Sequence, residues 1–181
     1  MPIPPLPLEA RHITMTADEY VTVNYQLWGR QPRTRRVTWL LFVSIALLTI
    51  SFGLGIWQRL RNPETDIFWG FLPAWGLALA YAWWRQWQVK RGLRQGYAKN
   101  TALRQPVDYL FDTGAIIGRS AAGEFSIRWQ TLHHAVRVND WLLLYPKQLA
   151  CYYVDLRRLI APATTDSLLE LLDEKEIVVY Q

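Results

Sequence analysis

The chain has 181 residues, with 20 Lys and Arg against 15 Asp and Glu, and one cysteine. An aromatic content of 14% excludes a disordered chain, and a single cysteine excludes a disulfide-rich scaffold. Most of the ten tryptophans lie between Trp39 and Trp87. The mean hydropathy near zero is therefore an average over two unlike regions.

Residues 1–37 are expected to form a cytoplasmic N-terminal region. Prolines crowd the first eight residues and predict an extended, mobile tail. Residues 9–15 are expected to form a short strand. Thr16 and Glu19 have the spacing of a capping box, which predicts a short helix ending near Trp28.

Two segments without any charged residue, 38–57 and 67–84, follow this region. At about 1.5 Å per residue, each helix would match the thickness of a bilayer's hydrocarbon core. Neither segment has a polar stripe, so two buried core helices would need apolar cover on every side. A cleaved signal peptide does not fit either, because a second segment follows the first closely. The sequence therefore predicts a transmembrane hairpin over 38–84, with an external loop at 58–66.

Tryptophans mark the ends of both predicted spans. An indole ring favours the headgroup region, because the ring is apolar and its N–H group needs a hydrogen-bond partner. We therefore assign six tryptophans to the membrane interfaces: Trp39, Trp57, Trp69, Trp83, Trp84 and Trp87.

Positive charge lies on one side of the predicted hairpin, before the first span and after the second. The positive-inside rule then predicts a multi-pass protein of the bacterial inner (plasma) membrane with both termini in the cytoplasm. Residues 85–104 are expected to form a basic juxtamembrane helix, which either contacts anionic lipid or serves only as a topology signal. The candidates for lipid contact in these flanks are Arg33, Arg35, Arg36, Arg85, Lys90, Arg91 and Arg94.

Neither span contains Asp, Glu, Lys, Arg or His, which argues against a transporter or pump. Small residues recur at helical spacing, as at Ser51 and Gly55. Such a ridge either packs within the hairpin or forms the contact surface of a homodimer.

From Gln105 onward acidic residues outnumber basic residues, so the excess positive charge is not on a folded domain. We therefore expect no nucleic-acid partner.

Residues 105–181 change to a strand pattern. Phe125–Trp129 alternates apolar and polar residues, and Trp141–Tyr145 is a solid apolar run. We expect a meander of five or six antiparallel strands, a helix capped by Asp166, and a last strand at 177–180. The predicted fold class is an α+β membrane protein: a two-helix transmembrane hairpin plus a small antiparallel half-barrel closed by a C-terminal helix.

Four segments carry a family resemblance: MTADEY at 15–20, PVDYLFDTGAII at 106–117, FSIRWQTLHHAV at 125–136 and WLLLY at 141–145. The chain resembles the YcxB-like family of bacterial membrane proteins. This resemblance implies that residues 105–181 form a domain similar to pleckstrin-homology (PH) folds. The sequence departs from the family pattern at 154–158, which affects the register of the last strands. The family has no established activity, so the resemblance implies no catalytic residue.

No motif for catalysis is present: there is no glycine-rich phosphate loop, nucleophile elbow or metal-ligand spacing. His133 and His134 are adjacent, so on a strand they face opposite ways and are interpreted as surface residues. We expect no enzyme activity, no metal and no cofactor. Arg128 and Arg137 would share an outer face if their strands pair as a hairpin, either to contact anionic lipid or as a solvated face.

The leading hypothesis is a non-enzymatic integral inner-membrane protein whose PH-like domain contacts anionic lipid or an unknown protein partner. A second hypothesis is an immunity-type protein that protects the inner membrane from a toxin. A third is an oligomeric channel, which would need several chains because two helices cannot enclose a pore.

Overall fold

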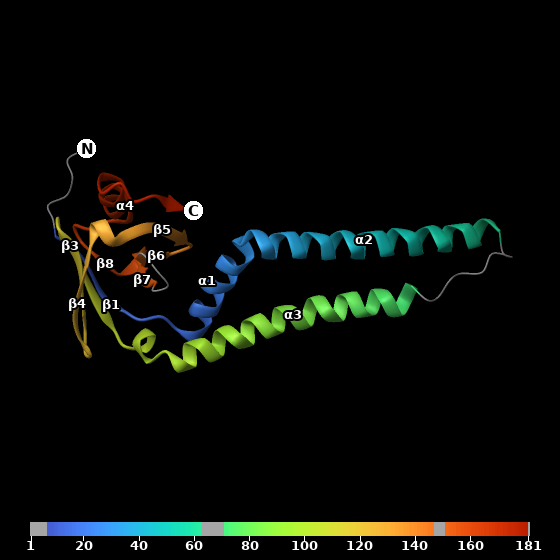
Figure 1. Ribbon diagram of the computed structural model, residues 1–181, viewed down its shortest axis with the longest axis horizontal. Coiled ribbons are helices and arrows are strands. Elements are labelled where there is room, and N and C mark those ends of the chain that lie inside the picture. Colours follow the sequence, from blue (N-terminus) through green and yellow to red (C-terminus); the bar gives the residue numbers. More distant parts are fainter. Residues whose placement is uncertain (1–6, 63–70, 147–150, 181) are drawn as a thin grey trace. The chain divides into compact units, whose positions relative to one another are not determined.

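The computed structural model describes residues 7–62, 71–146 and 151–180. The chain divides into two compact units (Figure 1), which we call the β unit (1–23 and 94–181) and the helical unit (24–93). The fold is α+β, with one long apolar helix and two small sheets.

The first long element after the N-terminal strand is α1 (Ala17–Arg30). It begins with the predicted capping box: the Glu19 carboxylate accepts from the Thr16 backbone N–H at 2.9 Å, and the Thr16 hydroxyl accepts from the Glu19 N–H at 3.3 Å. Each bond satisfies a backbone donor that has no partner inside the helix. This prediction is confirmed, and the helix continues two residues beyond Trp28.

Helix α2 (Pro32–Arg61) contains the first predicted span and extends beyond both of its ends. Among the helices of the described residues, α2 is the one long and apolar enough to cross a membrane. The second predicted span begins at residues 67–70, which lie outside the described residues, as does Trp69. Helix α3 (Phe71–Lys99) contains the rest of that span and most of the predicted basic helix in one continuous element. The second crossing of the membrane therefore stays a prediction.

Of the predicted small-residue ridge, Ser51 is exposed and Gly55 is half-buried, and a Cβ added at Gly55 would meet no atom within 4 Å. Two polar side-chain bonds connect α2 with α3: the Trp75 indole donates to the Thr49 hydroxyl at 3.1 Å, and Arg85 donates to the Thr38 hydroxyl at 3.3 Å.

The β unit contains two sheets and the helix α4, which are drawn in Figure 1. One has the order β4-β3-β2-β1-β8 and the other β7-β6-β5-β9. The strands are β1 (Leu8–Ile13), β2 (Val107–Phe111), β3 (Ala115–Ser120), β4 (Gly123–Arg128), β5 (Leu132–Val138), β6 (Trp141–Pro146), β7 (Tyr152–Asp155), β8 (Leu159–Ile160) and β9 (Val179–Tyr180). Short 3-10 helices lie at η1 (Thr101–Arg104), η2 (Trp129–Thr131) and η3 (Leu156–Arg158).

The predicted single meander is divided into two sheets between β4 and β5, and several strands pair with partners outside it, including β8 with β1. The N-terminal strand β1 pairs antiparallel with β2, Leu8 opposite Phe111, so it belongs to the same unit as the C-terminal strands. The last strand, β9, pairs parallel with β5, Ala135 opposite Val179. Both pairings join segments far apart in the sequence, which local patterns do not reveal.

Helix α4 (Thr165–Glu174) begins two residues earlier than it would if Asp166 were its N-cap. Thr164 is the N-cap: its hydroxyl accepts from the Ser167 N–H at 3.1 Å, and the Ser167 hydroxyl accepts from the Thr164 N–H at 2.8 Å. The prediction of Asp166 as the cap is wrong, because a complete capping box forms with Thr164.

The core of the β unit is formed by fully buried side chains, the largest being Phe111, Leu8, Ile116, Leu142, Leu143 and Leu144.

Candidate membrane-interface site

The bend from α1 into α2 forms the base of the site. Gln31 separates the two helices and makes no side-chain cap, and Pro32 occupies the first turn of α2. That turn has no acidic residue, and Arg33, Arg35 and Arg36 are exposed along it. Unsatisfied backbone N–H groups at a helix N-terminus carry partial positive charge, so the arginines add to a field that already favours an anion.

Two open grooves meet at this bend. One, of about 550 Å³, is lined by Arg30, Arg35, Arg36, Trp39 and Leu40. The other, of about 420 Å³, has Arg35 and Trp39 in common with it and is otherwise lined mainly by aromatic side chains and threonines. The site therefore offers guanidinium groups beside an exposed indole and an apolar helix face.

Arg85 links the site to α3. Its side chain is half-buried, its guanidinium carbon lies 4.9 Å from the centroid of the Trp28 ring, and it donates to Thr38 at 3.3 Å. A cation over an aromatic face is attracted to the negative charge of the ring's quadrupole. Arg85 is thus held in place by its neighbours, whereas Arg35 and Arg36 remain exposed.

Other predicted basic residues also lie on aromatic rings. The Lys90 ammonium is 5.2 Å from the Tyr25 ring centroid, and the Arg91 guanidinium is 5.0 Å from that of Trp87. At the other end of α2, Arg61 lies 4.1 Å from the Trp57 ring centroid. The sequence predicted which cations are present but not that Tyr25 and Trp28 bind them.

The predicted interface tryptophans within the described residues are exposed. Trp39 is 63% exposed and Trp83 is 73% exposed, although indole is among the most apolar side chains. Trp57, Trp84 and Trp87 are about half exposed. Large exposed apolar side chains in this number mark a surface that meets another apolar phase or a partner.

Of the predicted lipid contacts, Arg35 and Arg36 line the grooves, and three others lie in the β unit. Arg94 forms an ion pair with Asp18 at 3.1 Å within the β unit. Arg128 is on β4 and Arg137 on β5, strands that belong to different sheets and do not pair. The expected hairpin face shared by Arg128 and Arg137 is therefore absent, because η2 separates their strands and directs each into its own sheet.

The β unit contains a buried carboxylate that the sequence pattern does not indicate. Asp155 is 2% exposed and accepts from Arg157 through the backbone N–H at 3.0 Å and the guanidinium Nε at 2.8 Å. Arg157 also donates to Glu19 at 2.9 Å, which connects η3 to the first turn of α1. These two carboxylates raise the pKa of the Arg157 guanidinium above its ordinary value. The network therefore ties the 3-10 helix η3 to the start of α1.

No group of three or more potential metal ligands occurs among the described residues. His133 is exposed, and His134 is half-buried and stacked on Tyr145, with ring centroids 4.7 Å apart.

Comparisons of the chain with family models, with curated proteins and with solved structures found no match. The resemblance to the YcxB-like family therefore stays a prediction.

Proposed function

We propose that the protein is a non-enzymatic, integral inner-membrane protein, with α2 and α3 as a two-helix hairpin, that binds anionic phospholipid at the α1–α2 bend. The observation that carries this proposal is the pair of grooves sharing Arg35 and Trp39. Guanidinium groups suit phosphate, because their planar donors match its oxygens. The adjoining apolar helix suits the acyl chains of the same lipid.

The exposure of α2 supports a lipid environment. Its single buried residue in the described structure is Thr34, while Phe42 is 70% and Leu47 is 59% exposed. A helix that is apolar on all sides and uncovered by protein is stable where the solvent is hydrocarbon. The positive charge before α2 and along α3 supports cytoplasmic termini through the positive-inside rule.

The β unit is proposed to lie in the cytoplasm and to contact lipid or a protein partner there, with a fold related to PH domains. The immunity-type and channel hypotheses stay predictions, since no contact in the described residues favours either of them.

Lipid selectivity in a reconstituted bilayer tests the proposal. We would reconstitute the full chain in phosphatidylcholine vesicles and measure, by electron paramagnetic resonance, the association of spin-labelled phosphatidylglycerol relative to spin-labelled phosphatidylcholine. The double variant Arg35→Gln with Arg36→Gln should reduce this preference by about 30-fold, since each of the two cations contributes about 1 kcal/mol near a membrane surface.

The matched control removes the same charge from the β unit, as Arg11→Gln with Arg119→Gln, two exposed arginines paired with Glu9 and Glu124. This control should keep the preference of the wild type. An unchanged preference in the Arg35/Arg36 variant, or an equal loss in both variants, would contradict specific binding at the bend.

A further inference from the structure

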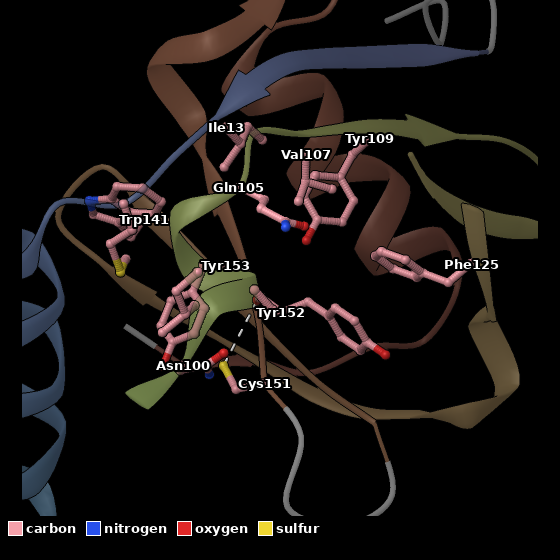
Figure 2. A pocket seen from close by; sticks show the side chains of 13 residues that line it. Ile13, Asn100, Gln105, Val107, Tyr109, Phe125, Trp141, Cys151, Tyr152 and Tyr153 are labelled. Carbon is pink, nitrogen blue, oxygen red and sulfur yellow. Dashed lines mark hydrogen bonds between the residues drawn. The ribbon is translucent and has the colours of Figure 1, made fainter. Parts of the chain in front are cut away.

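A second site lies inside the β unit and is independent of the membrane proposal. The two sheets and the segment around η1 line a half-open cavity of about 180 Å³. Figure 2 shows its labelled side chains, which come from β1, β2, β4, β6, β7 and the segment around η1. Five of the lining residues are aromatic, namely Tyr109, Phe125, Trp141, Tyr152 and Tyr153, and most of the others are apolar, with Asn100 and Gln105 as the two amides.

A cross-strand row of alternating small and large residues shapes one wall. Ala10, Tyr109, Gly118 and Phe125 are direct neighbours across β1, β2, β3 and β4. The Phe125 ring lies over Gly118, where an added Cβ would come within 2.1 Å of it. Phe125 also stacks on Tyr152 of the other sheet, with ring centroids 5.2 Å apart. Gly118 thus gives Phe125 the space to reach the second sheet and close that side of the cavity.

The Tyr109 hydroxyl has no hydrogen-bond partner among the described residues, although Tyr109 is only 5% exposed. In the described part of the chain, every fully buried side-chain nitrogen or oxygen atom has a hydrogen-bond partner. A hydroxyl without a partner, such as that of Tyr109, is therefore not fully buried. The hydroxyl therefore borders open space, and the space that Tyr109 lines is the cavity. Buried tyrosine hydroxyls usually find a partner, because an unpaired donor is costly away from water.

The described residues that line the cavity carry no charged side chain, since neither Lys, Arg, Asp nor Glu is among them. Burial, with smaller effects from Tyr152 and Cys151, raises the pKa of Tyr109, so its hydroxyl remains a donor. Burial also raises the pKa of the Cys151 thiol to about 12, despite opposing hydrogen bonds with Tyr145 and Tyr153. A charged ligand would lose its hydration here without gaining a counter-ion.

We propose that this cavity binds a neutral, mostly apolar small molecule, about the size of a substituted benzene, whose single acceptor oxygen takes a hydrogen bond from the Tyr109 hydroxyl. The volume sets the size, because an engineered apolar cavity of about 150 Å³ in another protein holds benzene. The aromatic walls favour a flat ring that can pack against them. The unpaired Tyr109 donor selects the acceptor, and the uncharged lining excludes acids and amines.

Three fluorinated probes of nearly equal size separate these requirements. We would add 4-fluoroacetophenone, 1-ethyl-4-fluorobenzene or 4-fluorobenzoate to the full chain in nanodiscs and measure binding by ¹⁹F NMR, with empty nanodiscs as the blank for partitioning into lipid. The ketone should bind, the ethyl analogue should bind about tenfold more weakly because it lacks the acceptor, and the benzoate should not bind.

Two variants locate the bound probe. Tyr109→Phe keeps the ring and removes the donor, so it should abolish the difference between the ketone and the ethyl analogue. Ala102→Trp adds a ring at an exposed position of the cavity lining, outside the core, and should reduce binding of both probes at least tenfold. Thermal unfolding of each variant confirms that the β unit remains folded.

Three results would overturn the proposal. One is a ketone signal no larger with the protein than with empty nanodiscs. Another is equal binding by the wild type and Ala102→Trp, which would place the probe elsewhere. The third is a preference for the ketone that survives in Tyr109→Phe. None of these results bears on lipid selectivity at the α1–α2 bend, so the two proposals fail separately.

Discussion

The helical unit and the β unit use the same apolar side chains in opposite ways. In the β unit, Phe111 and Leu143 are completely buried. In the helical unit, Phe42 is 70% exposed and Trp83 is 73% exposed. The β unit therefore supplies its own apolar environment through long-range strand pairing. The helical unit makes few side-chain bonds between its helices and requires an apolar environment from outside, which we propose is the bilayer.

Replacing one phenylalanine by alanine in each unit tests this contrast. Among the predicted effects, this one should give the largest difference in unfolding free energy. Phe111→Ala removes a fully buried ring and should lower the unfolding free energy of the β unit by about 3–5 kcal/mol. Phe42→Ala removes an exposed ring and should change it by less than about 0.5 kcal/mol. Chemical denaturation in detergent micelles, followed by hydrogen exchange of the strand amides, measures both. Similar losses in the two variants would contradict the division into an internally stabilised unit and an externally stabilised one.

A glycine substitution tests how tightly the β unit is packed. Gly118→Ala places a methyl group against the Phe125 ring, which forms part of a stacked aromatic wall, and should cost about 1–3 kcal/mol. Gly114→Ala is the matched control, because a Cβ there meets no atom within 4 Å. The same denaturation experiment applies. If Gly118→Ala were as stable as Gly114→Ala, the close packing around Phe125 would be wrong.

The smallest expected effect concerns the pH dependence of the β unit. Burial raises the pKa of Glu19, but hydrogen bonds from Thr16 and the Arg157 guanidinium outweigh it, so the net pKa lies below the ordinary value of 4.5. The carboxylate therefore stabilises the folded state above that value, and its contribution is lost as the pH falls through the lower folded-state pKa.

Glu19→Gln should remove this part of the acid sensitivity. We would compare unfolding free energies at neutral pH and below pH 4.5, with Glu124→Gln, in an exposed ion pair with Arg119, as the control. The wild type and the control should lose more stability on acidification than Glu19→Gln. An identical acid response in wild type and Glu19→Gln would show that the connection from η3 to α1 does not contribute.

The sequence predicted elements well where the signal is local. The capping box at Thr16 and Glu19, the apolar helix over 38–57, and the strands at Phe125 and Trp141 all depend on neighbours within a few residues. Pairings across long separations were not predicted, such as Leu8 with Phe111 and Ala135 with Val179.

The same limit applies to the two sites. Arg35, Arg36 and Arg85 follow from the charge pattern, but the position of Arg85 over Trp28 depends on how three helices meet. The cavity could not be predicted at all, because its lining comes from segments distant in the sequence. A tyrosine on a strand looks the same in sequence whether or not its hydroxyl has a partner.

The most direct test of the central claim is the environment of α2 in a bilayer. In a Cys151→Ser background, nitroxide labels would be placed along α2, including Leu47, and at the exposed Gln130 of the β unit. Collision rates with oxygen, which concentrates in hydrocarbon, and with a nickel chelate, which stays in water, would then be compared. We expect the oxygen-to-nickel ratio to be highest near Leu47, to fall toward both ends of α2, and to be low at Gln130. A Leu47 label that collides with the nickel chelate as often as the Gln130 label would contradict a membrane-spanning α2.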